Sequence, residues 1–143
     1  MGRRRQSRLP ARVEARRRRT IDSRKKWEPA GNPEDLARFF VLRANAGDVD
    51  GLVALYEPDA VLVGSEGQFL IGSAAIRDFY AGLLANQPTF VAGEQRPALR
   101  HGDIALTSSR LVNGIVTAEV ARQQADGTWL WAIDQPAIAQ ETA

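Results

Sequence analysis

Three segments in the N-terminal half of the chain repeat apolar positions at helical spacing. The first, 33–46, begins after Asn32, a residue type that caps helices well, and the second is expected over about 48–56. The third, 74–86, follows Ser73, which is expected to cap it, and it carries a single apolar stripe. The pattern therefore predicts three helices.

Beyond the second helix, which Pro58 and Asp59 are expected to end, the pattern becomes that of strands. Short apolar runs bounded by turn residues predict strands over 60–64, 67–71, 89–100, 103–112, 115–124 and 128–135. Asn113-Gly114 and Asp126-Gly127 are strong signals for tight hairpins. Helices followed by an antiparallel meander indicate an α+β fold.

Two-residue hairpin loops would fix which residues of the last three strands lie opposite one another. Asn113-Gly114 would place Ser108 opposite Glu119, and Asp126-Gly127 would place Glu119 opposite Asp134. Because opposed residues share a sheet face, one face is expected to collect small side chains, two carboxylates and an arginine. Its members would be Leu106, Ser108, Arg110, Thr117, Glu119, Ala121, Leu130, Ala132 and Asp134.

Glu119 and Asp134 would then form a pair of candidate catalytic carboxyls. Opposed carboxylates in a low dielectric resist ionising together, so one keeps a proton near neutral pH and can act as a general acid or base. Two other interpretations remain open. Arg110 could pair with Glu119 while Asp134 accepts structural hydrogen bonds, or a longer turn could shift the register and separate the carboxyls.

The opposite sheet face would carry two tryptophans, an arginine and two aliphatic residues. They are Val120, Arg122, Trp129, Trp131 and Ile133. If the helices cover the carboxylate face, this face is exposed, and contiguous exposed apolar side chains are typical of protein interfaces. We therefore expect a homodimer through the Trp129/Trp131 face, with burial of both tryptophans in the core as the alternative.

Charge is distributed unevenly along the 143 residues. Residues 1–26 contain 12 Lys and Arg and two acidic residues, a net charge of +10, whereas residues 27–143 contain seven Arg and 15 acidic residues, a net charge of −8. We divide the chain into a disordered basic tail over 1–30, a pocket domain over 31–138 and a C-terminal tail over 139–143. Nucleic acid is an expected partner only through the basic tail, and the alternative is an extension without function.

The composition also limits cofactors and location. Cysteine is absent and His101 is the only histidine, so disulfides, thiolate nucleophiles and histidine-rich metal sites are excluded. We expect no cofactor. No apolar run approaches the roughly 18 residues of a membrane span, and no secretory signal is recognisable, which favours a cytoplasmic protein without membrane contact.

Several short motifs over about residues 33–138 resemble the SnoaL-like and ketosteroid-isomerase-like proteins of the nuclear transport factor 2-like superfamily. The motifs are Ala46-Gly47-Asp48, Pro58-Asp59-Ala60, Gly72 with Ala75-Ile76-Arg77, and Asp126-Gly127-Thr128-Trp129. The resemblance implies a curved antiparallel sheet wrapped by three helices into a cone with a pocket. It also implies a dimer through the outer sheet face.

The resemblance to ketosteroid isomerases can be followed residue by residue. The position of their general-base Asp falls on Gly64, and that of their oxyanion-donating Tyr falls on Phe40, so both groups are absent here. Their second oxyanion donor, a protonated Asp, corresponds to Glu119. These departures argue against steroid isomerisation by that mechanism. Asp134 is the remaining acid/base candidate for a polyketide-cyclase-like reaction.

The expected pocket takes a small apolar molecule. Lining candidates besides the two carboxyls are Phe40, Tyr56, Phe69, Phe79, Ser108, Arg110 and Ala132. One expected function is acid/base chemistry, as an isomerase, cyclase or hydratase, through Glu119 and Asp134. The alternative is a non-catalytic binding module or dimeric scaffold, which a pocket filled by aromatic side chains would favour.

Overall fold

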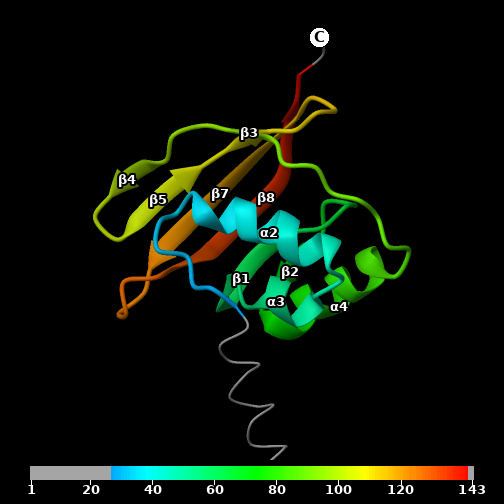
Figure 1. Cartoon of the computed structure of the whole chain (residues 1–143), viewed down its shortest axis with the longest axis horizontal. Coiled ribbons are helices and arrows are strands. Elements are labelled where there is room, and N and C mark those ends of the chain that lie inside the picture. The colour runs from blue at the N-terminus through cyan, green and yellow to red at the C-terminus, as the bar shows by residue number, and fades with distance from the viewer. Residues whose placement is uncertain (1–26, 142–143) are drawn as a thin grey trace, which may run out of the picture.

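The computed structural model describes residues 27–141, which form three helices and eight strands (Figure 1). The helices are α2 (Asp35–Asn45), α3 (Val49–Val53) and α4 (Ser73–Leu84). The strands are β1 (Tyr56–Val63), β2 (Phe69–Ile71), β3 (Glu94–Gln95), β4 (Leu99–His101), β5 (Ile104–Thr107), β6 (Ser109–Arg110), β7 (Ile115–Gln123) and β8 (Trp129–Gln140). The α+β class expected from the sequence is confirmed.

All strands belong to one sheet, with the order β2-β1-β8-β7-β5-β4 and with β6 joining β3 to β7. Every pair is antiparallel except β1 and β8, which run parallel. The sheet is therefore mixed, and the expectation of a fully antiparallel sheet is wrong at this one pair. A parallel pair needs a long crossover connection, and here α4 and six strands separate β1 from β8 in the chain.

The helices cover one face of the sheet, which we call the inner face. Figure 1 shows α2 crossing β7 and β8 while α3 and α4 gather beside β1 and β2, and α4 packs on both of these strands. Leu36 of α2, Ile76 of α4 and Leu62 of β1 meet in the core and are completely buried. Burial of these helical stripes against the sheet is what stabilises helices of this length.

Two helix starts differ from the prediction. Asn32 does not cap α2, because α2 begins at Asp35, and Asn32 lies in the preceding turn, where its backbone N–H donates to Asp35 Oδ2 at 3.1 Å. Ser73 is the first residue of α4, and Gly72 takes the capping position with φ +87°. That backbone angle lies in the left-handed region, which favours glycine.

Pro58 and Asp59 lie inside β1 and do not end a helix, as α3 already ends at Val53. The pairing of β1 with β8 is irregular between Tyr56 and Val61. A proline has no N–H to donate to a strand ladder, and irregular pairing of this kind is where a strand tolerates one.

The Asn113-Gly114 loop contains three residues instead of two. Leu111 N–H donates to Ile115 O at 2.8 Å, which closes the loop, and Gly114 N–H donates to Leu111 O at 2.9 Å. Gly114 has φ +86° and Asn113 does not have a positive φ, which is the geometry of a type I turn followed by a left-handed residue.

The longer loop shifts the predicted register by one residue. Glu119 lies opposite Thr107, not Ser108. A shift of one residue turns each side chain to the other face of the sheet. As a result, Thr107 and Ser109 are buried on the inner face, whereas Ser108 and Arg110 lie on the outer face.

The Asp126-Gly127 loop is also one residue longer than predicted. Gln124 N–H donates to Thr128 O at 2.7 Å, and Gln123 pairs with Trp129. The predicted register is therefore wrong next to this turn as well.

A bulge in β8 reverses that second shift. Beyond Ala121, which pairs with Trp131, the register of β8 against β7 changes by one residue. Glu119 consequently lies opposite Asp134, as predicted, although only because the loop error and the bulge cancel. The bulge also brings Trp131 and Asp134 to the same face, which regular alternation would forbid.

Residues 27–30, which we assigned to the tail, belong to the fold. Trp27 Nε1 donates to Asp48 Oδ2 at 2.7 Å, and Ala30 is buried and accepts a hydrogen bond from Trp129 N at 2.9 Å. The predicted boundary at residue 31 is therefore too late.

The C-terminal boundary differs too, because β8 continues to Gln140 through residues that we had placed in a tail. The predicted disorder of residues 1–26 lies outside the described residues. Within residues 27–141, every helix is too short and too polar to cross a membrane.

Candidate functional site

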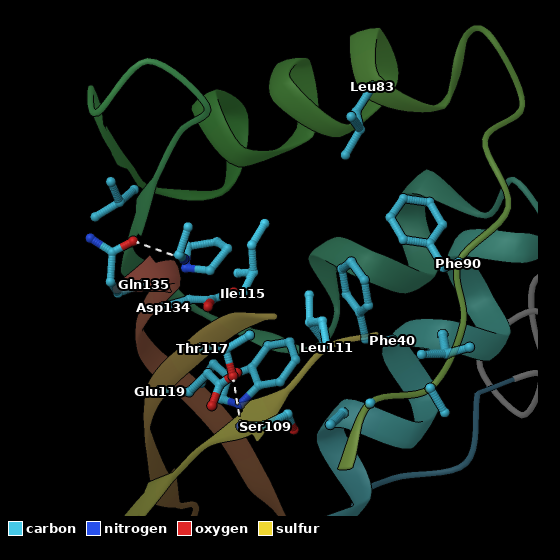
Figure 2. Close-up of a pocket in the computed structure, with 18 of the residues that line it drawn as sticks. Phe40, Leu83, Phe90, Ser109, Leu111, Ile115, Thr117, Glu119, Asp134 and Gln135 are labelled. Atoms are coloured by element: carbon cyan, nitrogen blue, oxygen red, sulfur yellow. Dashed lines mark hydrogen bonds between the residues drawn. The ribbon is translucent and has the colours of Figure 1, made fainter. Parts of the chain in front are cut away.

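A cavity of about 780 Å³ lies between the helices and the inner face of the sheet. Most of its wall is apolar, formed by Phe40, Val41, Leu42, Phe79, Leu83, Phe90, Val91, Leu111, Ile115 and Trp131. Figure 2 shows Phe40 and Phe90 on one side of the space and Thr117, Glu119 and Asp134 on the sheet side. The cavity thus has a long apolar body and one polar wall.

The polar wall is built by β6, β7 and β8. Ser109, Thr117, Glu119 and Asp134 line the cavity, and each is at least nine-tenths buried. Thr117 and Glu119 are two residues apart on β7, so they point to the same face. The one-residue bulge in β8 adds Asp134 directly opposite Glu119.

Asp134 is at the end of a buried hydrogen-bond chain. Tyr56 donates its hydroxyl hydrogen to Asp134 Oδ2 at 2.5 Å, and the hydroxyls of Tyr56 and Tyr80 are 2.6 Å apart. Because Tyr56 has one hydroxyl hydrogen and gives it to Asp134, Tyr80 is the donor to Tyr56. Burial raises the pKa of both tyrosines and the charge of Asp134 raises it further, so both hydroxyls stay protonated.

The pKa of Asp134 is shifted towards neutrality. Burial raises it from 3.8 to about 7, the hydrogen bond from Tyr56 opposes that rise, and the nearby charge of Glu119 adds to it. Near neutral pH the carboxyl therefore has both its protonated and its ionised form accessible.

Glu119 is also shifted. Burial raises its pKa, and the hydroxyls of Thr117 and Thr107 act in the opposite direction. Thr107 Oγ1 donates to Glu119 Oε2 at 3.0 Å. The two carboxyls share one polar wall, with hydrogen-bond donors behind each of them.

Only some of the predicted pocket residues line the cavity. Phe40 and Phe79 line the cavity, and Tyr56 lies behind Asp134 instead of on the wall. Phe69 does not line it and is 74% exposed at the edge strand β2. Ala132, the bulge residue, is also absent from the wall.

Ser108 and Arg110 are outside the cavity for the reason of register given above. Ser108 Oγ donates to Thr117 O at 2.6 Å, and Arg110 Nε pairs with Glu141 Oε2 at 3.1 Å. The interpretation in which Arg110 neutralises Glu119 is therefore wrong. The residues missed by the register error, Thr107 and Ser109, take the places predicted for polar neighbours of Glu119.

The predicted exposed tryptophan face is wrong. Trp129 and Trp131 are 1% and 3% exposed and belong to the core, and Trp131 forms part of the cavity wall. The tryptophan ring of residue 131 packs against Tyr56, with 5.2 Å between ring centroids, and against Phe40 at 6.2 Å. Within residues 27–141, no three side chains of the kinds that ligate metals converge into a group that could hold an ion.

Solved structures show the same fold. A candidate calcium/calmodulin-dependent protein kinase type II association domain from Thiobacillus denitrificans has a TM-score of 0.62 and 19% identity, covering 76% of this chain and 96% of its own. A ketosteroid isomerase-like protein from Erwinia carotovora atroseptica has a TM-score of 0.54 and 22% identity, covering 71% and 88%. A candidate dehydratase of the NTF2-like family from Streptomyces avermitilis has a TM-score of 0.56 and 17% identity, covering 73% and 93%.

These likenesses concern the fold alone. They confirm the nuclear transport factor 2-like architecture expected from the sequence motifs. The family model of the SnoaL-like domain matches residues 36–141, which is most of the chain. The protein therefore belongs to the SnoaL-like domain family.

Proposed function

We propose that the protein binds an apolar small molecule in the cavity and transfers a proton to or from it through Asp134, with Glu119 as the second carboxyl of the site. One observation carries this proposal: two buried carboxyl residues occupy directly opposed positions of β7 and β8 in the polar wall of a mostly apolar cavity. A carboxyl with a pKa of about 7 is suited to both directions of proton transfer at neutral pH.

The hydrogen bonds assign a task to each oxygen of Asp134. Oδ2 accepts from Tyr56, which fixes the orientation of the carboxyl, so Oδ1 is the oxygen left for a ligand. In its ionised form Asp134 takes a proton from the bound molecule, and the acid that results returns it at another atom. This sequence fits an isomerase, a cyclase or a hydratase.

Glu119 has a supporting part in this scheme. Its charge adds to the raised pKa of Asp134 and so favours the protonated form of that carboxyl. The site differs from that of the ketosteroid isomerases, because Gly64 and Phe40 occupy the positions of their base and of one oxyanion donor. Proton transfer would start from β8 here and not from β1.

Exchange of carbon-bound hydrogen provides a direct test. The full chain is incubated in D₂O at pH 7 with a panel of cyclic and aryl ketones, and deuterium uptake next to the carbonyl is followed by NMR. We expect uptake above the buffer rate for at least one ketone, and its loss in Asp134→Asn. Uptake that is equal in both proteins would refute the role of Asp134.

The alternative function is ligand binding without chemistry. It is favoured if a ketone of the panel binds, as seen by saturation-transfer NMR, while deuterium uptake stays at the buffer rate in both proteins. If no ketone binds, the acid/base proposal loses its support from the apolar wall. The same panel therefore separates catalysis from binding.

We also propose a homodimer, through a row of residues that keeps Val120 and Ile133 of the predicted face but not its two tryptophans. One apolar residue from each of six strands lies in register across the outer face of the sheet: Leu99, Leu106, Val120, Ile133, Val61 and Ile71. Leu99 and Ile71 are 70% and 65% exposed. A flat apolar row of this length suits a self-complementary contact with a second copy.

Light scattering of the full chain tests the dimer. The wild type should show twice the chain mass of 15.7 kDa, and Leu106→Lys, within the row, should shift it towards the monomer. Val112→Lys is the matched control, because Val112 is an exposed aliphatic residue in a hairpin loop outside the row. A monomeric wild type, or equal effects of both substitutions, would exclude this interface.

A further inference from the structure

The segment between α4 and β3 forms part of the cavity wall without being a helix or a strand. Phe90, Val91, Ala92 and Gly93 line the cavity from this segment. Phe90 packs edge-on against Phe40 of α2, with 5.6 Å between the ring centroids. In Figure 2 both rings lie on the same side of the space, facing the polar wall.

The cavity meets solvent in more than one place, and one of these openings is the seam between this segment and α2. Leu42 of α2 and Val91 both line the cavity, yet each is 60% exposed. A residue can line the cavity and also be exposed to solvent only where the cavity wall ends. An apolar seam of this kind is suited to the entry of an apolar molecule.

One side chain fastens the seam. The carboxamide of Asn45 accepts from Phe90 N–H at 2.7 Å and donates to Phe90 O at 2.9 Å, so it reproduces both hydrogen bonds of a strand pair. Asn45 is three residues after Leu42, which places both on the same side of α2. Among residues 27–141, nothing else makes a hydrogen bond to residues 88–93.

The ends of the segment are fixed, which leaves the middle as the part that can move. Gln87 has φ +50° and its N–H donates to Leu84 O at 3.0 Å. At the other end Gly93 lies so close to β6 that a Cβ would come within 2.8 Å of Arg110 O. Both anchors hold the backbone, while the exposed residues between them are held to α2 by Asn45.

We propose that residues 88–92 form a strap across the cavity entrance and that Asn45 is the latch that sets how often the entrance opens. This inference rests on the proposal that the cavity binds an apolar molecule. Loss of the two hydrogen bonds raises the open fraction about tenfold, the change that about 1.4 kcal/mol produces. Association and dissociation of a ligand then accelerate together, and the dissociation constant changes little.

Stopped-flow fluorescence with N-phenyl-1-naphthylamine, an uncharged aromatic dye, tests the latch in the full chain. We expect both rate constants to rise about tenfold in Asn45→Ala. Alanine favours helix, so α2 is retained in this variant. Asn45→Asp replaces the donor with a carboxylate oxygen that faces Phe90 O, so its rates should rise at least as far as those of Asn45→Ala.

Asn86→Ala is the matched control, because Asn86 is an exposed asparagine beside the strap whose side chain makes no hydrogen bond within the described chain. Its rates should equal those of the wild type. Exchange of the Phe90 amide hydrogen, followed by NMR, should also accelerate about tenfold in Asn45→Ala and not in Asn86→Ala.

Two results would overturn the latch. If the wild type binds the dye and Asn45→Ala has the same rates, the strap does not control entry, although the ligand cavity stands. If Asn45→Ala weakens the dissociation constant with an unchanged association rate, Asn45 only shapes the wall. Absence of dye binding in every variant would count against the ligand cavity itself and, with it, the latch.

Discussion

Replacing Asp134 by Asn should make the protein more stable, and increasingly so as the pH rises. The pKa of Asp134 is raised from 3.8 to about 7 by burial, so the folded protein retains a proton that the unfolded chain has lost between these values. A carboxyl of this kind lowers the free energy of unfolding as pH increases through that window. The full penalty, reached above about pH 7, is about 4 kcal/mol.

The change of this stability difference with pH is a sharper test than the stability difference at one pH. For values of 3.8 and about 7, the penalty from Asp134 is about 2 kcal/mol at pH 5 and about 4 kcal/mol at pH 8. Asn carries no such penalty, and its side-chain oxygen still accepts from Tyr56. The advantage of Asp134→Asn over the wild type should therefore grow by about 2 to 3 kcal/mol between pH 5 and pH 8.

Urea unfolding of the full-length wild type and variant at the two pH values measures this growth. Titrating groups that do not interact with residue 134 cancel in the difference. Asp103→Asn is the control, because Asp103 is an exposed carboxyl next to the β4–β5 turn, and its difference from the wild type should stay constant. A constant difference for Asp134→Asn as well would mean that the burial argument is wrong.

Four other substitutions test three separate parts of the structure. Tyr56→Phe removes a hydrogen bond that favours ionised Asp134, so the pKa of that carboxyl should rise further in a ¹³C NMR titration, and an unchanged value would contradict its cause. Arg43→Ala leaves unpaired two backbone carbonyls that lie 2.8 and 2.9 Å from the guanidinium. The free energy of unfolding in urea should therefore fall by about 3 kcal/mol, and a loss below about 1 kcal/mol would contradict the importance of these bonds. Gly67 has φ +78° and open space around it, so Gly67→Ala should lower the free energy of unfolding by about 1 kcal/mol. Gly114 has φ +86° and a backbone carbonyl where its Cβ would lie, so Gly114→Ala should lower it clearly more. Equal losses in the two variants would contradict the role of that contact.

The helices and most strands could be read from the sequence because their signals are local, but of the strand predicted over 89–100 only β3 and the start of β4 are present. Apolar spacing located α2 and α4 to within a few residues, and both hairpin turns are where their Asn-Gly and Asp-Gly pairs indicated. Loop length was the part that this signal could not determine. Asn-Gly and Asp-Gly fit a two-residue loop and also a three-residue loop that ends in a left-handed glycine.

A side-chain signal for the longer loop was present in the sequence. Asp126 Oδ1 accepts from Thr128 N at 3.0 Å and Asn113 Oδ1 accepts from Ile115 N at 3.1 Å, bonds from a side chain to the backbone two residues on. Such bonds accompany a turn residue with negative φ. An acceptor side chain just before the loop glycine, with a hydroxyl residue just after the glycine in the second loop, could have indicated three residues.

The bulge in β8 had no local signal at all. It is imposed by packing, because Trp131 fills the space beside Tyr56 while Leu62 of β1 pairs with Asp134 in the parallel ladder. Trp131 and Asp134 can both point to the inner face only if one extra residue lies between them in β8. The candidate site therefore depends on a long-range feature, and its correct residue pair emerged from a register that was wrong on both sides of it.

The energetic argument for Asp134 extends beyond its pKa. If residue 134 only had to accept a hydrogen bond from Tyr56, an asparagine would do so equally well. It would also avoid the penalty of about 4 kcal/mol that the carboxyl carries above pH 7. That penalty is comparable to a large part of the net stability of a small domain. Asp134 lines a cavity and lies opposite a second carboxyl residue. This arrangement lowers the stability of the protein but provides a group that titrates near neutral pH. The pH-dependent gain of Asp134→Asn measures that cost directly, which is why it is the most informative single result for the proposed acid/base role.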